Sequence, residues 1–499
     1  MALISALCVG TAWWFPGEIP GALLAWLGMG FLLLTLLQAE RPYLCAYISG
    51  VLTSCLGFYW LAGTISEFGG FSPPATALIF TGFTLFNALQ YLICSFLFLN
   101  LPVGLDRFAL RLSLAWTAAE FLTVRIFPWQ IGHTQLAFLP FVQIADLAGA
   151  QLVSFLLCWI TEALVRFCYL KERHLRMLAP ALAGAAALAY GFFTIHAIKK
   201  IEGPTQTVAL VQANLTIAEK HDIKYFKQNT ARYLALSKEA RRHKPNLLII
   251  WPETVLQEWI PAEVGHVKHD SRVPYLGEDA ALLLGTFSVE NNRYLFNSAM
   301  AVLPDGSVPP PYHKRILMPF GEYMPFATWL PWIQSLNPGA ANFSSGSSAG
   351  VFNIPIMDAL TETKVLKVAP LICYEDVVQS LAREAVLAGA ELLVNLTNDA
   401  WFGRSVAPYQ HHQIAAFRSI ENRRYLLRST NSGLTAVVDA TGATTASIPP
   451  FSEGVLFADL QPFSVRTIYS RIGDLPWWLL SLGCVAAAVL QCTRRKLTR

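Results

Sequence analysis

Residues 368–376 read VAPLICYED, an apolar run that stops at Cys373 and becomes acidic at Glu375 and Asp376. A short apolar run that ends abruptly in polar residues is typical of a buried strand followed by a turn. A strand-to-helix turn here would expose the Cys373 side chain together with unpaired backbone N–H groups. The segment therefore predicts a sheet that carries a thiol at the end of one strand.

Similar apolar runs recur through residues 199–474, which we interpret as one α/β domain. The runs that predict buried strands are 208–211, 247–251, 282–287, 298–302, 368–373, 392–396 and 434–438. The apolar spacing predicts helices over 224–243, 377–388 and 411–424. Strands and helices alternate early, whereas adjacent strands follow in the middle, so we expect a layered sheet structure rather than a simple doubly wound one.

Charged residues are distributed unevenly along the 499-residue chain. Asp, Glu, Lys and Arg number 16 in residues 1–198, 50 in 199–474 and 4 in 475–499, while 54% of all residues are hydrophobic. This pattern excludes a soluble enzyme and a disordered chain. It also excludes a nucleic-acid-binding protein, because no basic face or arm is long enough to follow the phosphates.

Apolar runs of about 20 residues predict transmembrane helices, because a helix satisfies its own backbone inside a bilayer. We predict about eight spans, of which the first seven form a membrane domain of residues 1–198 and the last lies in 475–499. The predicted spans are 2–15, 21–38, 43–61, 76–100, 108–124, 147–169, 177–197 and 475–492.

The basic residues of the short loops predict the orientation of these spans. They concentrate on one side, which the positive-inside rule assigns to the cytoplasm. Both termini are then cytoplasmic, and the polar domain of residues 199–474 lies on the extracytoplasmic face. This orientation depends on the first span, which is short and ends at Pro16.

Cys373 is the only cysteine between residues 199 and 474, since the other eight lie in or beside predicted spans. Without a disulfide partner in that segment, it is either an inert buried thiol or a reactive one. A thiol reacts as the thiolate and needs a base or a neighbouring cation. Glu253 and Lys314 also lie near predicted strand ends and could supply these groups, although each could equally be a solvated surface charge.

Two further hypotheses follow from the residues alone. A histidine could act as the base for Cys373 in a Cys–His hydrolase. The candidate histidines are His313, His411 and His412. Acidic residues in or beside the predicted spans would suit a transporter. These residues are Glu120, Asp146 and Glu162.

Several motifs of the polar domain resemble the nitrilase superfamily. They are WPE at 251–253, HKRILMPFGEYMPF at 313–326, ICYED at 372–376, NDAWFG at 398–403, PYQH at 408–411 and LRSTNSG at 427–433. With spans before and after the domain, the whole chain resembles the membrane-embedded branch of that superfamily, the bacterial apolipoprotein N-acyltransferases. The resemblance implies a layered α-β-β-α domain on the periplasmic face of the cytoplasmic (inner) membrane.

The resemblance also implies a catalytic set. Glu253 would be the general base, Lys314 the cation that stabilises the oxyanion, and Cys373 the nucleophile, with Glu322 and Glu375 in supporting roles. Substrate contacts would fall to Tyr374, His221, Trp401 and Phe402. His221 follows Lys220, at a place where the family has Trp after Lys, so the chain departs from the family pattern there.

The implied reaction is ping-pong acyl transfer. An acyl chain would move from a membrane phospholipid, through a Cys373 thioester, to the N-terminal amine of the diacylglyceryl-cysteine of an apolipoprotein. We expect no cofactor, metal or nucleic acid, and a monomer in the lipid bilayer. A membrane-tethered amidase of the nitrilase type shares the first half of this chemistry and remains the alternative, followed by the transporter.

Aromatic and apolar residues at 318–336 suit the membrane interface, and the Gly- and Ser-rich residues 337–350 could form a movable lid. The same segments could instead cover a sheet edge and form a slack loop.

Overall fold

The computed structural model divides the chain into two units. It describes residues 1–67, 69–172, 175–201, 205–244, 247–324, 327, 329–330, 332, 342–357, 363–462 and 464–497. Unit 1 comprises Met1–Lys200, Arg404–Glu421 and Arg466–Arg499, and unit 2 comprises Ile201–Gly403 and Asn422–Val465. Residues 404–421 and 466–474, which belong to the polar segment by sequence, thus group with the apolar helices.

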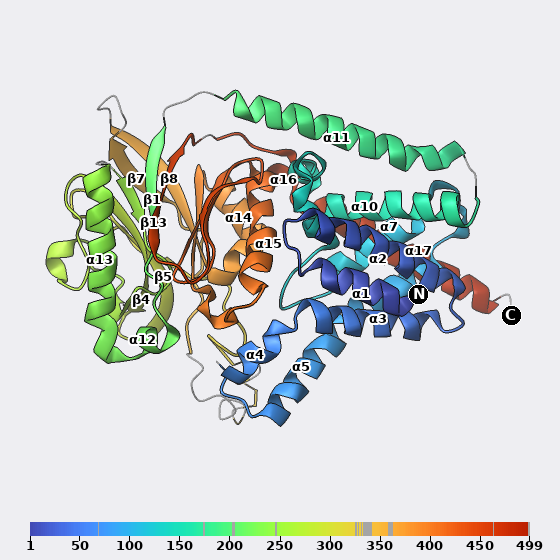
Figure 1. Ribbon diagram of the computed structural model, residues 1–499, viewed down its shortest axis with the longest axis horizontal. Helices are drawn as coiled ribbons and strands as arrows, with labels where there is room; N and C mark the ends of the chain where they lie inside the picture. Colours follow the sequence, from blue (N-terminus) through green and yellow to red (C-terminus); the bar gives the residue numbers. More distant parts are fainter. Residues whose placement is uncertain are drawn as a thin grey trace. The chain divides into compact units, whose positions relative to one another are not determined.

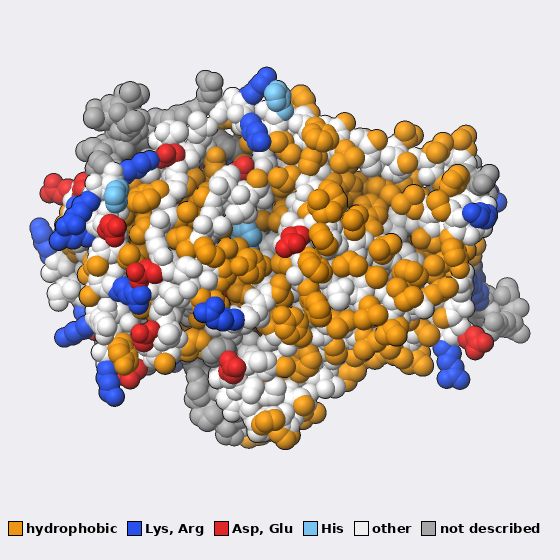
Figure 2. All heavy atoms as spheres, viewed as in Figure 1, with side chains coloured by type: hydrophobic (Ala, Val, Ile, Leu, Met, Phe, Trp, Pro, Cys, Tyr) orange, Lys and Arg blue, Asp and Glu red, His pale blue; other side chains and the backbone are white. Residues whose placement is uncertain are grey.

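Unit 1 is built from helices (Figure 1). They are α1 (Ala2–Ala12), α2 (Ile19–Gln38), α3 (Pro42–Gly57), α4 (Trp60–Glu67), α5 (Pro73–Asn87), α6 (Leu89–Asn100), α7 (Arg111–Leu122), α8 (Leu139–Val142), α9 (Ala145–Ala148), α10 (Ala150–Leu164), α11 (Leu178–Lys199), α15 (Ala407–Asn422), α16 (Ile468–Ile472) and α17 (Leu475–Leu497). On the face seen in Figure 2, hydrophobic side chains cover most of these helices and charged ones are sparse. Such a surface fits a lipid environment better than water.

Five helical segments among the described residues are long and apolar enough to cross a membrane. They are Ile19–Gln38, Pro73–Asn100, Ala150–Tyr169, Leu178–Lys199 and Leu475–Arg495. The pair α3 and α4, bent by 62°, would make a sixth span if it crosses as one. The helices found within the predicted spans 2–15 and 108–124 have only 11 and 12 residues. The arrangement with about eight spans therefore stays a prediction.

Helix α15 belongs to unit 1, although the strands before and after it belong to unit 2. Gln410, from the PYQH motif, donates a hydrogen bond to the Trp13 carbonyl at 2.7 Å and accepts one from the Trp60 indole at 2.9 Å. At the other end of the helix, the Glu421 carboxylate accepts a hydrogen bond from the Ala150 N–H at 3.1 Å. Buried polar contacts thus fix both ends of α15 among the apolar helices.

Unit 2 contains two sheets. The first has the order β13-β1-β2-β4-β5-β6, with β3 paired to β4, and the second has the order β12-β11-β10-β9-β8-β7. The strands are β1 (Gln206–Gln212), β2 (Leu247–Ile250), β3 (Leu256–Pro261), β4 (Ala280–Glu290), β5 (Tyr294–Val302), β6 (Tyr312–His313), β7 (Phe352–Met357), β8 (Thr363–Ile372), β9 (Leu392–Thr397), β10 (Tyr425–Thr430), β11 (Thr435–Val438), β12 (Thr444–Ile448) and β13 (Gly454–Leu460). The centre of each sheet is parallel: β1, β2 and β4 in the first, and β8, β9 and β10 in the second.

The two sheets face each other across a shared hydrophobic core. In β1, Val208 and Leu210 enter this core, whereas Ala209 and Val211 pack on the opposite face with Tyr233 of α13 (Phe226–His243). This alternation is that of a strand buried on both faces. Helix α14 (Gln379–Leu387) packs against β8, and Figure 1 shows α13 and α14 on opposite sides of the paired sheets. The predicted layered α/β domain is thus observed, in the order α-β-β-α.

Candidate active site

Three strand ends bring together the residues that the sequence singled out. Glu253 lies three residues after β2, Lys314 follows β6 directly, and Cys373 follows β8 directly. The first two come from one sheet and the third from the other. Lys314 Nζ lies 3.6 Å from Glu253 Oε1, and both charges act on the Cys373 thiol. The site therefore lies where the two sheets meet.

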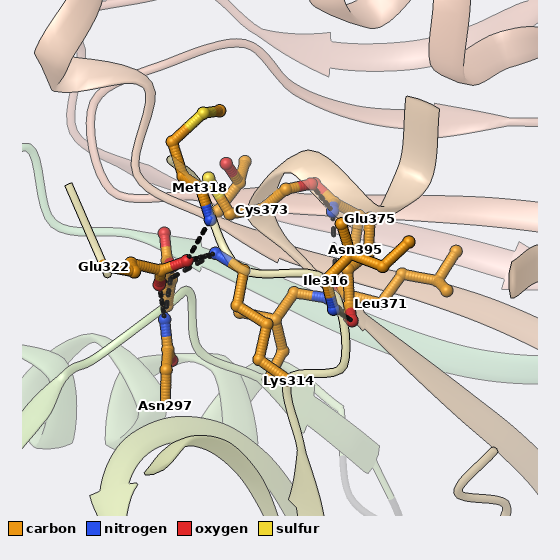
Figure 3. A network of polar contacts seen from close by, with 12 residues as sticks. Asn297, Lys314, Ile316, Met318, Glu322, Leu371, Cys373, Glu375 and Asn395 are labelled. Carbon is orange, nitrogen blue, oxygen red and sulfur yellow. Dashed lines mark hydrogen bonds and ion pairs between the residues drawn. The ribbon is translucent and has the colours of Figure 1, made fainter. Parts of the chain in front are cut away.

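Lys314 is buried between two carboxylates. Its ammonium group donates a hydrogen bond to Glu322 at 2.9 Å, and its side chain is only 1% exposed. Asn297, on β5, donates to Glu253 at 2.8 Å and to Glu322 at 2.9 Å, and so joins the two acids. The Met318 N–H also donates to Glu322, at 2.8 Å (Figure 3). Burial alone would lower the pKa of Lys314, but the neighbouring negative charges, Glu322 foremost, raise it above its ordinary value, so the lysine stays a cation.

Close backbone packing fixes the loop that carries Glu253. Thr254 adopts a left-handed backbone with φ of 48°. A Cβ atom added at Gly285 on β4 would lie 2.5 Å from the Thr254 nitrogen and 2.6 Å from the Glu253 Cα. Because real Cβ contacts are never that short, only glycine allows the loop to lie against β4.

Cys373 sits at a strained turn. It opens the 3-10 helix η8 (Cys373–Val377) with a φ of 52°, which is uncommon for a residue with a Cβ atom. Burial raises the pKa of its thiol and the Glu253 charge raises it further, whereas Lys314 and a side-chain hydrogen bond with Thr397 lower it. The net pKa lies above the ordinary value, so the resting group is a thiol rather than a thiolate.

Glu375 connects the turn that begins at Cys373 to the loop that carries Lys314. This carboxylate is fully buried and accepts four hydrogen bonds. The donors are the N–H groups of Ile372 at 2.8 Å, Arg315 at 2.7 Å and Ile316 at 3.2 Å, and the Tyr312 hydroxyl at 2.9 Å. Arg315 and Ile316 directly follow Lys314 and Ile372 precedes Cys373, so Glu375 fixes the two loops relative to each other.

Further buried polar residues support the turn, and the sequence assigned none of them a role, although Asp376 and Arg428 lie in the motifs at 372–376 and 427–433. Asn395, on β9, donates to the carbonyls of Leu371 at 3.1 Å and Cys373 at 2.9 Å. Arg428, on β10, donates to Asp376 of η8 at 3.0 Å, and both side chains are fully buried. The signal that could have revealed them, together with Asn297, is a polar residue inside an otherwise apolar strand.

The residues predicted to contact substrate are placed only in part. Tyr374 follows Cys373 and is half-buried, as are Trp401 and Phe402 at the end of the 3-10 helix η9 (Asp399–Phe402). The His221 side chain lies outside the described residues, as do most residues between 325 and 341 of the predicted interface and lid segments.

Trp329 and Trp332, which are described, are 79% and 61% exposed. Exposed aromatic rings are compatible with contact with lipid.

The histidines suggested as alternative bases have other surroundings. His313 shares a hydrogen bond with the Ser298 hydroxyl at 2.8 Å and stacks on Phe296 with ring centroids 3.9 Å apart. His411 and His412 lie on α15 in unit 1. Among the described residues, no group of three or more His, Cys, Asp or Glu side chains could hold a metal ion.

Two family models match the chain. Residues 207–469 match carbon-nitrogen hydrolase, and residues 8–163 match the apolipoprotein N-acyltransferase N-terminal domain.

Apolipoprotein N-acyltransferases from several bacteria match nearly the whole chain. That of Geobacter metallireducens is 29% identical over 100% of this chain and 96% of its own. That of Vibrio cholerae is 30% identical over 90% and 89%, and that of Shewanella oneidensis is 31% identical over 88% and 85%. Among solved structures, an amidase from Nesterenkonia sp. covers 55% of this chain and 97% of its own at 17% identity and a TM-score of 0.37.

Proposed function

The chain belongs to the apolipoprotein N-acyltransferase family, and we propose that its acyl transfer proceeds through a thioester on Cys373. The activity itself, N-acylation of lipoproteins, follows from the family. The observation that carries the proposed mechanism is the meeting of Cys373 with a buried Lys314 and a carboxylate, Glu253, at the junction of two sheets. This trio contains a nucleophile, a fixed cation and a base.

The first half of the proposed reaction acylates the enzyme. The Glu253 carboxylate takes the proton from Cys373, and the thiolate attacks the ester carbonyl carbon of a phospholipid. The Lys314 ammonium and backbone N–H groups near Tyr374 stabilise the oxyanion, a contact worth about 3–4 kcal/mol per donor in measured cases. The C–O bond then breaks, Glu253 gives its proton to the departing alkoxide, and a lysophospholipid leaves.

The second half transfers the acyl chain to the lipoprotein. The free N-terminal amine of the diacylglyceryl-cysteine attacks the thioester carbon, and a C–N bond forms as the C–S bond breaks. Glu253 accepts a proton from the amine and returns it to the Cys373 thiolate. The thioester is less stable than the ester, but the amide is more stable than both, so the overall transfer needs no ATP.

Both substrates carry acyl chains, so the site must reach them at a membrane. We propose that unit 1 spans the bacterial cytoplasmic membrane with both termini in the cytoplasm, that the site lies on the periplasmic face, and that the protein acts as a monomer. The apolar segments long enough to cross a bilayer and the hydrophobic surface seen in Figure 2 support the membrane location.

Intact-protein mass spectrometry tests the thioester directly. Purified protein in detergent is incubated with phospholipid, and the natural chain should gain one acyl mass that hydroxylamine removes. Cys373→Ala should gain none, whereas Cys168→Ala, which removes an exposed thiol of unit 1, should behave as the natural chain does. An adduct that persists in Cys373→Ala would contradict the mechanism. Release of ammonia from a primary amide without acyl transfer would favour the amidase.

A further inference from the structure

A second buried lysine lies beside the proposed catalytic residues and has no part in the mechanism above. Lys220 belongs to the helix α12 (Ile217–His221) and is only 4% exposed. Its ammonium group donates a hydrogen bond to the backbone carbonyl of Glu253 at 2.7 Å. Lysine is almost never buried unless its charge has a partner, so this position suggests a role.

Hydrogen bonds hold the short helix that carries Lys220 in place. Thr216 and Glu219 form a capping box, with Thr216 N–H donating to the Glu219 carboxylate at 2.8 Å and Glu219 N–H donating to the Thr216 hydroxyl at 3.2 Å. Asn229 on α13 donates to the Glu219 carbonyl at 2.9 Å. Because a five-residue helix is not stable by itself, these contacts fix the direction from which Lys220 enters the site.

The Glu253 carbonyl needs a donor from outside the sheet. Gly285 N–H donates to the Pro252 carbonyl at 3.1 Å, and Val255 N–H donates to the Gly285 carbonyl at 2.8 Å. These bonds tie both neighbours of the loop to β4 but leave the Glu253 carbonyl to Lys220. Since a buried carbonyl must be paired, the lysine fixes the backbone of the proposed base.

Lys220 also changes the charge balance of the site. Without it, one cation, Lys314, would stand against the carboxylates of Glu253 and Glu322. With it, two cations stand against two carboxylates. Moving the Cys373 proton to Glu253 leaves the net charge of the site unchanged, and the thiolate that forms is then stabilised by two cations rather than one.

The pKa of Lys220 agrees with a position close to the charges of Glu253 and Cys373. Burial lowers the pKa of Lys220 to about 8, and the charges of Glu253 and Cys373 act against that decrease. The ammonium form therefore still prevails at pH 7. Because such coupling is reciprocal, the lysine favours the Cys373 thiolate. Lys314 lowers the pKa of Cys373 more than Lys220 does, so the contribution of Lys220 is the smaller of the two.

We propose that Lys220 is a positioning residue of the active site, whose ammonium group holds the backbone of Glu253 and adds a second positive charge toward the Cys373 thiolate. The inference rests on the proposed function for the identity of the nucleophile and the base.

The pH dependence of Cys373 alkylation tests the inference. The full-length chain in detergent is treated with iodoacetamide, and modification of the peptide that contains Cys373 is followed by mass spectrometry from pH 6 to 11. We expect Lys220→Met to slow alkylation roughly three- to tenfold between pH 6 and 7.5, where Lys220 is an ammonium group, and the difference to shrink above pH 8, where Lys220 loses its charge. Lys224→Met, which changes a lysine whose side chain is 81% exposed, should leave the profile unchanged.

Lys220→Gln separates the two parts of the role, since glutamine keeps an N–H donor for the Glu253 carbonyl but carries no charge. We expect it to recover the melting temperature lost in Lys220→Met while keeping the slower alkylation at pH 7.5. If Lys220→Met does not fold, Lys220→Gln alone is compared with Lys224→Met.

Identical alkylation profiles for the Lys220 and Lys224 variants would overturn the inference. That result would leave the acyl adduct and its dependence on Cys373 intact. Failure of the proposed function is distinguishable, because the natural chain would then form no adduct at all or Cys373→Ala would still form one.

Discussion

The Nζ atom of Lys314 lies 3.6 Å from Oε1 of Glu253, while the same ammonium group lies 2.9 Å from Glu322. The shorter contact is a charge-assisted hydrogen bond and the longer one is a through-space attraction. Glu322 therefore neutralises the lysine, and Glu253 keeps an oxygen atom for the proposed proton transfer. This division of roles explains why the site needs two carboxylates around one cation.

Replacing the proposed base should stop chemistry without unfolding the site. Glu253→Gln keeps the shape of the side chain and an oxygen for the Asn297 amide, but glutamine cannot take a proton from Cys373. We expect the rate of acyl-enzyme formation to fall at least about 100-fold, the lower range for loss of a general base. Time-resolved intact-protein mass spectrometry measures this rate.

The matched control for that prediction is Glu263→Gln, which changes an exposed glutamate of the same unit and should have no effect. A near-normal rate in Glu253→Gln would assign the proton to another group.

The raised pKa of Cys373 predicts a thiol that is unreactive at rest. Because burial and the Glu253 charge hold the pKa above its ordinary value, iodoacetamide should modify Cys373 more slowly in the folded chain at pH 7.5 than in the denatured chain. Reactivity should rise as the pH passes the folded pKa. Lys314→Met should raise the midpoint further, because Lys314 lowers this pKa. Faster modification of the folded chain would instead indicate a resting thiolate.

Glu375 should prove structural as well as functional. Glu375→Gln replaces an acceptor of four hydrogen bonds with a side chain that has one acceptor oxygen and presents an NH₂ group to the backbone donors. Leaving buried donors unpaired should cost about 3 kcal/mol. The melting temperature should fall by roughly 6–12 °C for a unit of this size.

Glu384→Gln on α14 is the control for this change, because its side chain is 42% exposed. Equal melting temperatures for the two variants would contradict the positioning role of Glu375.

The strands that the sequence predicts are those with continuous apolar runs, such as β2, whose four residues are all buried. The missed strands lack that signal for identifiable reasons. β10 carries Arg428, which is tolerated in the interior because Asp376 neutralises it. β12, with the sequence TTASI, lies at a sheet edge and is largely exposed. Apolar runs detect burial of apolar side chains, so strands that bury ion pairs or none of their side chains go undetected.

Sequence patterns also revealed the candidate site only in part. Glu253 and Cys373 could be singled out because each comes at or just after an apolar run, and a polar residue at a strand end is conspicuous. Lys314 receives its role through the resemblance of the motif at 313–326. Asn297 and Asn395 lie within strands, where a single polar residue looks like the solvent-facing side of a sheet. Their importance depends on partners distant in the sequence, and only the structure brings these together.

Helix α15 offers a test of the polar contacts within unit 1. The Gln410 side chain donates to the carbonyls of Trp13 and Gly57 and accepts from the Trp60 indole, and Gln410 is only 4% exposed. Gln410→Ala would leave these three groups without that partner, at a cost of about 3 kcal/mol where water is excluded. We expect a lower melting temperature in detergent and faster proteolysis between residues 403 and 425.

Tyr409→Ala is the neighbouring control, because Tyr409 is 41% exposed and its removal leaves the Gln410 contacts intact. The two variants should differ clearly in stability while acyl-enzyme formation by the folded fraction remains close to normal in both, since neither residue belongs to the proposed catalytic set. If Gln410→Ala melts like Tyr409→Ala, the apolar packing of α15 rather than its hydrogen bonds holds the helix in unit 1.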